Sequence, residues 1–285
     1  MKTGITFDLF SQDYACFGEK RYQKIKSHGY ECLDFNLMDT ETVFYGKDFE
    51  KEIKREKEKI DSAGLTVFQT HGPWRWPPQD GAKEDRTERQ EKFKKAIIST
   101  AILGAKYMVG HPIMPYGIED VGQDFDECFK LNVDFWGELA LFGKKHGVTV
   151  CIENMPMPNF TLATPYILLR LVEKIGGDNI GICLDTGHVN VIKDLKIGEI
   201  IEKLGDKLKV LHVHDNDGLR DTHLYPFSGT FDWKSFTRAL RETKFSGVMN
   251  LETHLKNDLE VSEYEDECLR LANIAKTLAS LSFGE

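Results

Sequence analysis

The stretch CLDTGHVN (183–190) begins with apolar residues and then places Asp185 three residues before His188. A second stretch, LHVHDND (211–217), ends an apolar run in a similar way, with His212 followed by more histidine, aspartate and asparagine. Charged groups are costly to bury unless they are paired. Two segments that look buried and end in such groups therefore raise the question of which fold would place these side chains in a pocket.

The same kind of ending recurs along the chain. Eight short apolar runs, rich in β-branched residues, are typical of strands. They are residues 4–9, 30–36, 65–71, 106–111, 148–154, 180–185, 209–215 and 247–254. The last six close on an imidazole or a carboxylate, namely His71, His111, Glu153, Asp185, His212 with His214, and Glu252 with His254. The polar endings are therefore a property of the chain and not of one motif.

Segments with helical patterns separate the strands. They are residues 48–64, 87–105, 125–147, 166–177, 231–245 and 258–281. Repeated alternation of strand and helix predicts a parallel sheet covered by helices, and a closed (β/α)8 TIM barrel is its simplest form. An open doubly wound sheet is the alternative, but no GxGxxG follows the first strand. Because no linker-like stretch interrupts the pattern, we expect residues 1–285 to form a single α/β domain.

A barrel also explains the polar endings, since the C-terminal ends of its strands form the mouth of the active site. Glu153, Asp185, His212 and Glu252 end the fifth to eighth strands. A lone carboxylate at such a place usually pairs with a lysine or a helix N-terminus, but three carboxylates and an imidazole that converge need a cation. Oxygen ligands with one nitrogen favour Mn²⁺, with Mg²⁺, Co²⁺ and Zn²⁺ as further possibilities.

Five more residues are candidates for the same mouth. His188 lies three residues after Asp185, and Asp221 and His223 lie together in the segment 217–233. These three predict a second metal centre, although a D-x-H pair is equally typical of a turn. His71 and His111 would either bind a further ion or contact substrate oxygens. We leave both alternatives open.

Composition narrows the class of protein. The chain has 285 residues, a formal net charge of −9 and six cysteines without CxxC spacing. A net negative charge disfavours a broad nucleic-acid-binding face. No apolar run approaches the roughly 20 residues that span a bilayer, and the first residues do not resemble a signal peptide. We therefore expect a cytoplasmic protein with reduced thiols that binds neither membrane nor nucleic acid.

Four motifs together resemble the xylose-isomerase-like barrel superfamily: IEN (152–154), LDTGH (184–188), HVHDNDG (212–218) and LETH (251–254). This superfamily includes sugar isomerases, ketose 3-epimerases, inosose dehydratases and the endonuclease IV type of DNA repair enzyme. The resemblance runs from the third strand to the eighth. It implies that the four strand-end residues are the metal ligands, as in the epimerase branch, and that His188 contacts the substrate.

The sequence departs from the epimerase pattern in two places. Residues 157–159 stand where that branch has a further acidic residue, and Arg220 is displaced from the position of its substrate-binding arginine. The additional histidines and Asp221 match instead the extra ligands of the endonuclease IV type, which binds three metals. The segment HGPWRWPPQDG (71–81), however, is aromatic and proline-rich, unlike a basic DNA clamp. Its Trp74 would cover a sugar face or simply pack in the loop.

The resemblance and the residues together predict a divalent-metal-dependent isomerase or epimerase of a small sugar or polyol derivative. Proton transfer would run through a metal-bound enediolate, with Glu153 and Glu252 as the acid–base pair. We expect His188, His71, His111, Trp74 and Asp34 to contact this small-molecule carbohydrate. Three alternatives are a sugar or inosose dehydratase, an endonuclease IV-like trinuclear phosphodiesterase, and a barrel that binds sugar without catalysis. The oligomeric state is open.

Overall fold

A computed structural model describes residues 1–7, 14–255 and 260–283 of the chain. The described residues form one sheet of eight parallel strands, in the order β7-β6-β5-β4-β3-β2-β1-β8. The strands are β1 (Thr3–Phe7), β2 (Cys32–Asn36), β3 (Thr66–His71), β4 (Tyr107–Gly110), β5 (Thr149–Glu153), β6 (Ile180–Asp185), β7 (Leu208–His212) and β8 (Met249–Leu251). A parallel bridge between Val213 and Leu251 joins the two ends of the sheet, so the barrel closes.

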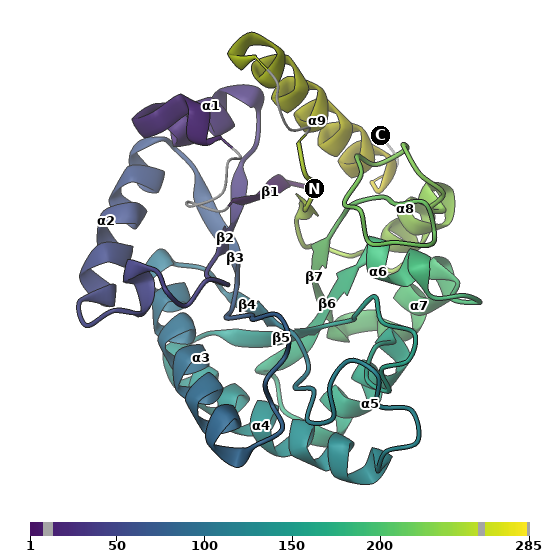
Figure 1. Cartoon of the computed structure of the whole chain (residues 1–285). Helices are drawn as coiled ribbons and strands as arrows, with labels where there is room; N and C mark the ends of the chain where they lie inside the picture. The colour runs from purple at the N-terminus through teal and green to yellow at the C-terminus, as the bar shows by residue number, and fades with distance from the viewer. Residues whose placement is uncertain (8–13, 256–259, 284–285) are drawn as a thin grey trace.

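Helices surround the barrel on its outer side (Figure 1). The α-helices are α1 (Arg21–His28), α2 (Phe49–Ser62), α3 (Lys83–Leu103), α4 (Phe125–His146), α5 (Pro165–Ile175), α6 (Thr186–Val191), α7 (Ile197–Leu204), α8 (Trp233–Glu242) and α9 (Val261–Leu281). Short 3₁₀ turns are η1 (Ala15–Lys20), η2 (Val43–Tyr45) and η3 (Gly205–Lys207). The (β/α)8 TIM barrel predicted from the sequence is thus confirmed.

The element bounds differ from the predicted ones in detail. Helices α1, α6 and α7 were not predicted, because each has at most eight residues and too few turns to show a periodic pattern. The predicted strand 209–215 ends at His212, and residues 213–215 continue only as isolated bridges. The predicted ends at residues 8–9 and the start at 258–259 lie outside the described residues.

The strand alternation builds layers inside the barrel. Every second side chain of a strand points inward, so residues two apart share a face at successive depths. A buried apolar layer consists of Val109, Cys151, Cys183 and Val210. Two positions later along the same strands come His111, Glu153, Asp185 and His212, which are also buried. The polar residues therefore form a layer above an apolar floor, at the C-terminal end of the barrel.

None of the helices in the described ranges combines the length and the apolar composition of a membrane-spanning segment.

Candidate metal centre and substrate pocket

The four predicted metal ligands lie together at the barrel mouth. Glu153, Asp185 and His212 end three neighbouring strands, and Glu252 directly follows β8. Each offers one ligand atom, and these atoms all lie within 4.8 Å of one another. The first three side chains are buried and Glu252 is 15% exposed. Three carboxylates in a buried space of this size repel one another unless a positive charge lies among them, so the arrangement suits a divalent cation.

His212 supplies part of that positive charge in the described structure. Its Nδ1 lies 2.8 Å from Glu153 Oε1 and 3.1 Å from Glu252 Oε2. Burial disfavours the charged ring, but Cys183 and the carboxylates of Glu153, Glu252 and Asp34 together outweigh this effect and raise the pKa of His212 well above its usual range. Burial likewise disfavours the charged form of Glu153, yet His212 and His111 hold the pKa of this carboxylate well below its usual range.

A second group of potential ligands shares Glu153. The Nε2 atoms of His71 and His111 lie 3.2 and 3.0 Å from Glu153 Oε2 and 3.3 Å from each other. His71 Nδ1 lies 2.8 Å from the carbonyl oxygen of Gly72, which leaves Nε2 facing the carboxylate. Burial lowers the pKa of His111 to about 4, against the opposing effect of Glu153. A neutral imidazole is the form that binds a metal.

A third group lies on the other side of the mouth. The carboxylate oxygen Oδ2 of Asp221 is 3.0 Å from His188 Nε2 and 3.3 Å from His223 Nε2. Burial opposes the charge on both rings, but the neighbouring carboxylates raise the pKa of His188 to about 10 and that of His223 to about 9. The positive charges of these imidazoles therefore balance the neighbouring carboxylates, a role that a bound metal ion would take over.

His214 belongs to the third group, although the sequence placed it only at a strand end and not among the candidate ligands. One of its ring nitrogens lies within 4.8 Å of the ligand atoms of His188, Asp221 and His223, and its Nε2 lies 3.0 Å from Asp185 Oδ2. Its position two residues after His212 was the available signal, since the alternation of an extended segment puts both rings on one face.

Gly187 makes room for the His214 ring. A Cβ atom built on Gly187 would lie 1.9 Å from His214 Cε1, far inside van der Waals contact. The ring stacks on His223, with 3.9 Å between the ring centroids. The first turn of α6 therefore packs directly on the third group, and any side chain larger than hydrogen at residue 187 would displace His214 from Asp185.

A cavity of about 190 Å³ is lined by members of all three groups of potential ligands. Its lining combines the potential ligands with apolar side chains. Its lining residues are Met38, His71, Trp74, Trp76, His111, Glu153, Met155, Pro156, Met157, His188, Asp221, His223 and Glu252. The Trp74 ring stands edge-on to His111, with 4.4 Å between centroids. The volume lies below the 300–1,000 Å³ of pockets for drug-sized ligands, so the cavity suits a small molecule.

Two other residues considered in the sequence analysis do not line this cavity. Asp34, which we expected to contact substrate, is fully buried, and its Oδ2 lies 2.8 Å from His212 Nε2. The His212 ring stands between this carboxylate and the carboxylates of Glu153 and Glu252, so Asp34 lies behind the cavity lining, and its contact with substrate stays a prediction. Arg220 pairs with Asp217 and its side chain is 77% exposed.

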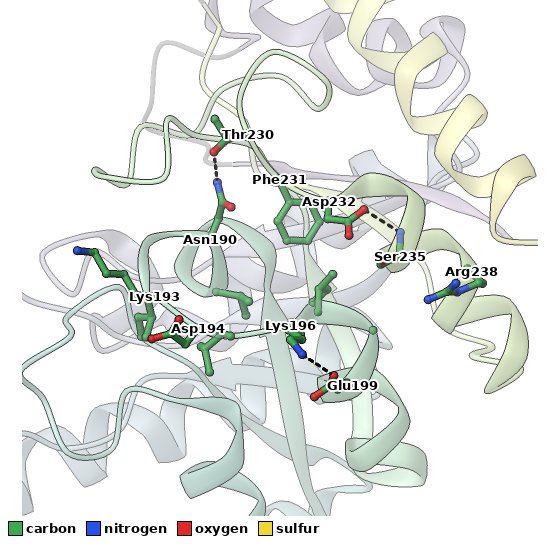
Figure 2. A pocket seen from close by; sticks show the side chains of 15 residues that line it. Asn190, Lys193, Asp194, Lys196, Glu199, Thr230, Phe231, Asp232, Ser235 and Arg238 are labelled. Atoms are coloured by element: carbon green, nitrogen blue, oxygen red, sulfur yellow. Dashed lines mark hydrogen bonds and ion pairs between the residues drawn. The ribbon is translucent and has the colours of Figure 1, made fainter.

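A second hollow, of about 380 Å³, lies between the segment that connects α6 to α7 and the start of α8 (Figure 2). Its charged side chains carry both signs, and Lys196 pairs with Glu199. Asp232 caps α8 by accepting a hydrogen bond from the Ser235 backbone amide. None of the predicted metal ligands lines this hollow. The candidate chemistry therefore belongs to the smaller cavity.

Comparison with known proteins agrees with the geometry. A family model described as "Xylose isomerase-like TIM barrel" matches residues 22–274. An uncharacterised protein of Sinorhizobium fredii is 35% identical over 169 residues, and this match spans 57% of the chain but only 52% of that relative's length. A D-psicose 3-epimerase of Enterocloster bolteae is 24% identical over 263 residues, which cover 88% of this chain and 82% of that enzyme.

Solved structures show the same fold over the whole chain. A D-psicose 3-epimerase crystallised in the presence of D-fructose superposes with a TM-score of 0.78 and 17% identity, and the match covers 100% of both chains. The structure of an IOLI protein with a bound zinc atom gives a TM-score of 0.74 and 21% identity, over 100% of this chain and 98% of the other. At these identities the likeness establishes the fold.

Proposed function

The chain belongs to the xylose isomerase-like TIM barrel family, and from this premise we propose that it is a divalent-metal-dependent isomerase or epimerase of a small sugar or polyol derivative. In this proposal residues 1–285 form a single catalytic domain. The observation that carries the proposal is the convergence of Glu153, Asp185, His212 and Glu252 within 4.8 Å of one another.

The donor chemistry supports a resident metal ion. Three carboxylates and one imidazole form a set that hard and borderline divalent cations accept, with Mn²⁺ favoured and Zn²⁺, Mg²⁺ and Co²⁺ compatible. An IOLI protein that shares the fold binds a zinc atom, which supports a resident metal ion in this barrel. We propose that the four strand-end residues hold the ion.

The relatives support the class of substrate. The D-psicose 3-epimerase of Enterocloster bolteae and the epimerase crystallised with D-fructose act on small sugars by their names. The cavity of about 190 Å³ fits a molecule of that class. Its lining includes Trp74 and three methionines, whose apolar surfaces can contact a sugar face. Which sugar it takes is left to experiment.

In the proposed reaction the residues of this chain move a proton. When bound, a divalent cation polarises a substrate carbonyl and acidifies the neighbouring C–H. Glu252, ionised at neutral pH because His212 lowers its pKa against the effect of burial, takes or returns the proton on one side. Glu153 does so on the other side. His188, His71 and His111, which line the cavity, hold substrate oxygens, and Trp74 covers the substrate and excludes water.

A second function is favoured by one observation. The groups around His71 with His111, and around His188 with Asp221 and His223, provide ligands for two more ions. A trinuclear phosphodiesterase of the endonuclease IV type would use such a set to activate a hydroxide and stabilise the leaving group. A dehydratase would use the first metal group alone, with loss of a hydroxyl group.

Hydrogen exchange tests the proposed function. We expect the metal-loaded protein to exchange a C–H next to the carbonyl of at least one ketose with deuterated water, as followed by proton NMR over a panel of sugars. Glu252→Gln should keep the fold and lower the exchange rate by at least about 10²-fold, the usual contribution of a general base. Glu199→Gln, which lies in the second hollow, is the matched control and should exchange at the wild-type rate. Wild-type exchange by Glu252→Gln would refute the assignment.

A further inference from the structure

Asp34 reaches across the barrel to the histidine of the proposed metal site. It lies on β2, while His212 ends β7, and these two strands are not neighbours in the sheet. The distance between Asp34 Oδ2 and His212 Nε2 is 2.8 Å, and neither side chain is exposed to solvent. The contact therefore depends on the closed barrel and not on adjacent backbone.

The surroundings of Asp34 leave His212 as its main partner. Its Oδ2 accepts further hydrogen bonds from Gln69 Nε2 at 2.9 Å and from Asn250 Nδ2 at 3.5 Å. The second oxygen, Oδ1, is buried and has no hydrogen-bond partner among the described residues. No lysine or arginine is paired with Asp34 in the described part of the chain. The other two donors are neutral amides, so among the described residues His212 is the one ionisable group paired with this buried carboxylate.

The two nitrogens of the His212 ring face opposite ways. Nε2 faces Asp34, and Nδ1 faces Glu153 and Glu252 on the cavity side. A metal-binding imidazole has to give up the proton on the nitrogen that faces the ion. Its other N–H commonly donates to a carboxylate, which fixes the tautomer and the orientation of the ring.

We infer that Asp34 is a positioning residue for the metal-binding histidine: it accepts the Nε2–H of His212 from behind and so presents Nδ1 to a divalent cation. Its negative charge, close to the ring in the buried interior, also makes Nδ1 a stronger donor. This inference rests on the proposed function, because it requires that the strand-end residues bind a metal.

Metal affinity tests the inference without any measurement of catalysis. Dissociation constants for Zn²⁺ and for Mn²⁺ would be measured on the purified full chain by competition with a chromophoric chelator. Asp34→Asn keeps the size of the side chain but removes its charge, and we expect the metal to bind about tenfold more weakly. Asp34→Ala removes the acceptor as well, and we expect a loss of up to about 100-fold, the range typical of such outer-shell partners.

A matched variant separates positioning from general stability. Val109 is fully buried in the apolar layer beneath the site and has no polar contact with His212. Val109→Ala should lower the urea midpoint of unfolding, because it leaves a cavity, while its metal dissociation constants stay within about twofold of wild type. Equal losses of metal affinity in Val109→Ala and Asp34→Asn would overturn the inference, because affinity would then follow stability.

A measurement on the unaltered protein covers the case in which the variants do not fold. Nitrogen-15 NMR of the histidine rings in the Zn²⁺-loaded protein should show His212 with a protonated Nε2 and a metal-bound Nδ1. A metal-bound Nε2, or an Asp34→Asn dissociation constant within twofold of wild type, would overturn the inference alone. A wild-type protein that binds no divalent cation would overturn the proposed function and this inference with it.

Discussion

Buried histidines of this chain meet two different electrostatic environments. At the barrel mouth, carboxylates surround His188 and His223 and raise their pKa values against the effect of burial. His28, at the end of α1, is 3% exposed, and its nearest carboxylate oxygen, on Glu265, is 3.7 Å from Nε2. Burial is the largest effect there and lowers the pKa of His28, although Glu265 opposes it. The same residue type is thus charged in one place and neutral in the other.

The lowered pKa of His28 predicts a loss of stability in acid. The folded state disfavours the proton that the unfolded chain accepts near pH 6.5, so stability is complete above that pH. It falls as the pH drops from 6.5 towards the folded-state value. We expect His28→Gln to lose less free energy of unfolding than wild type between pH 7 and 5, measured by urea denaturation of metal-free protein.

His146, which ends α4 and is exposed, offers the matched control. His146→Gln removes a histidine from the end of another helix, and its loss of stability over the same pH range should equal that of wild type. A pH profile of His28→Gln that coincides with wild type would show that this buried ring does not contribute to acid sensitivity.

Residues that follow strand ends could be predicted from the sequence, and contacts across the barrel could not. Glu153 and Asp185 follow apolar runs, and a barrel places all such residues at one mouth. The partner of Asp34 lies 178 positions away, on a strand that is not adjacent. No local pattern encodes that pairing, because it depends on which side chains are long enough to meet inside the closed barrel. His214 differs from Asp34, because its alternation with His212 is visible in the sequence and indicates that the two rings share a face.

The loop between β7 and α8 is the element that carries Asp221 and His223, and one buried residue organises it. The carboxylate of Asp215 accepts hydrogen bonds from the backbone amides of Asn216, Gly229 and Phe231 and from the indole of Trp233, at 2.9 to 3.1 Å. This carboxylate is fully buried. It links the start of the loop to its end, and so fixes the segment between them.

Removal of this carboxylate should loosen the whole loop. Asp215→Ala leaves several buried donors without an acceptor, and each such donor costs about 1–3 kcal/mol. We expect the free energy of unfolding to fall by about 3 kcal/mol or more in urea denaturation, and the loop to become a site of limited proteolysis. If Asp221 and His223 hold a further ion, that ion should be lost as well.

Asp217, two residues further on, tests whether position in the loop alone matters. Its carboxylate is partly exposed and bonds to the backbone of Leu219 and to Arg220. Asp217→Ala should leave the urea midpoint of unfolding close to that of wild type, because exposed ion pairs contribute little to stability. A similar loss in both variants would argue against the special role of Asp215.

Long elements were predictable and short ones were not. Helices α3 and α4 have more than 20 residues each, so most of each helix falls within the segments predicted as helical. Helix α6 has six residues, and its sequence TGHVNV has no apolar stripe. It forms because Asp185 at its N-cap accepts a hydrogen bond from the His188 amide and because Gly187 packs on His214. Both causes depend on side chains that come together only in the folded barrel, so the local sequence does not indicate them.

At the scale of the whole molecule, charge separates the two candidate functions. The chain contains 46 acidic and 37 basic residues, a formal net charge of −9. Binding to a duplex depends on lysines and arginines that replace the counterions of the phosphates. No lysine or arginine lines the cavity above the metal groups in the described residues. A small neutral substrate needs no such contacts, so the overall charge favours the sugar reaction even though three groups of potential metal ligands are present.

Metal content and duplex cleavage decide between these functions. For a sugar isomerase or epimerase with one essential ion, we expect no cleavage of a duplex that contains an abasic site. The double variant His71→Ala/His111→Ala should then keep the ion held through Glu153 and Asp185, as measured by elemental analysis. It should also bind sugar more weakly, because it has lost two groups that line the cavity.

For a trinuclear phosphodiesterase, the same histidines hold an ion that shares Glu153, so the double variant should lose one ion per chain together with cleavage. Cleavage of the abasic duplex by wild type, abolished in this variant, would show that the metal groups outweigh the unfavourable net charge. The phosphodiesterase would then replace the isomerase as the function of the site.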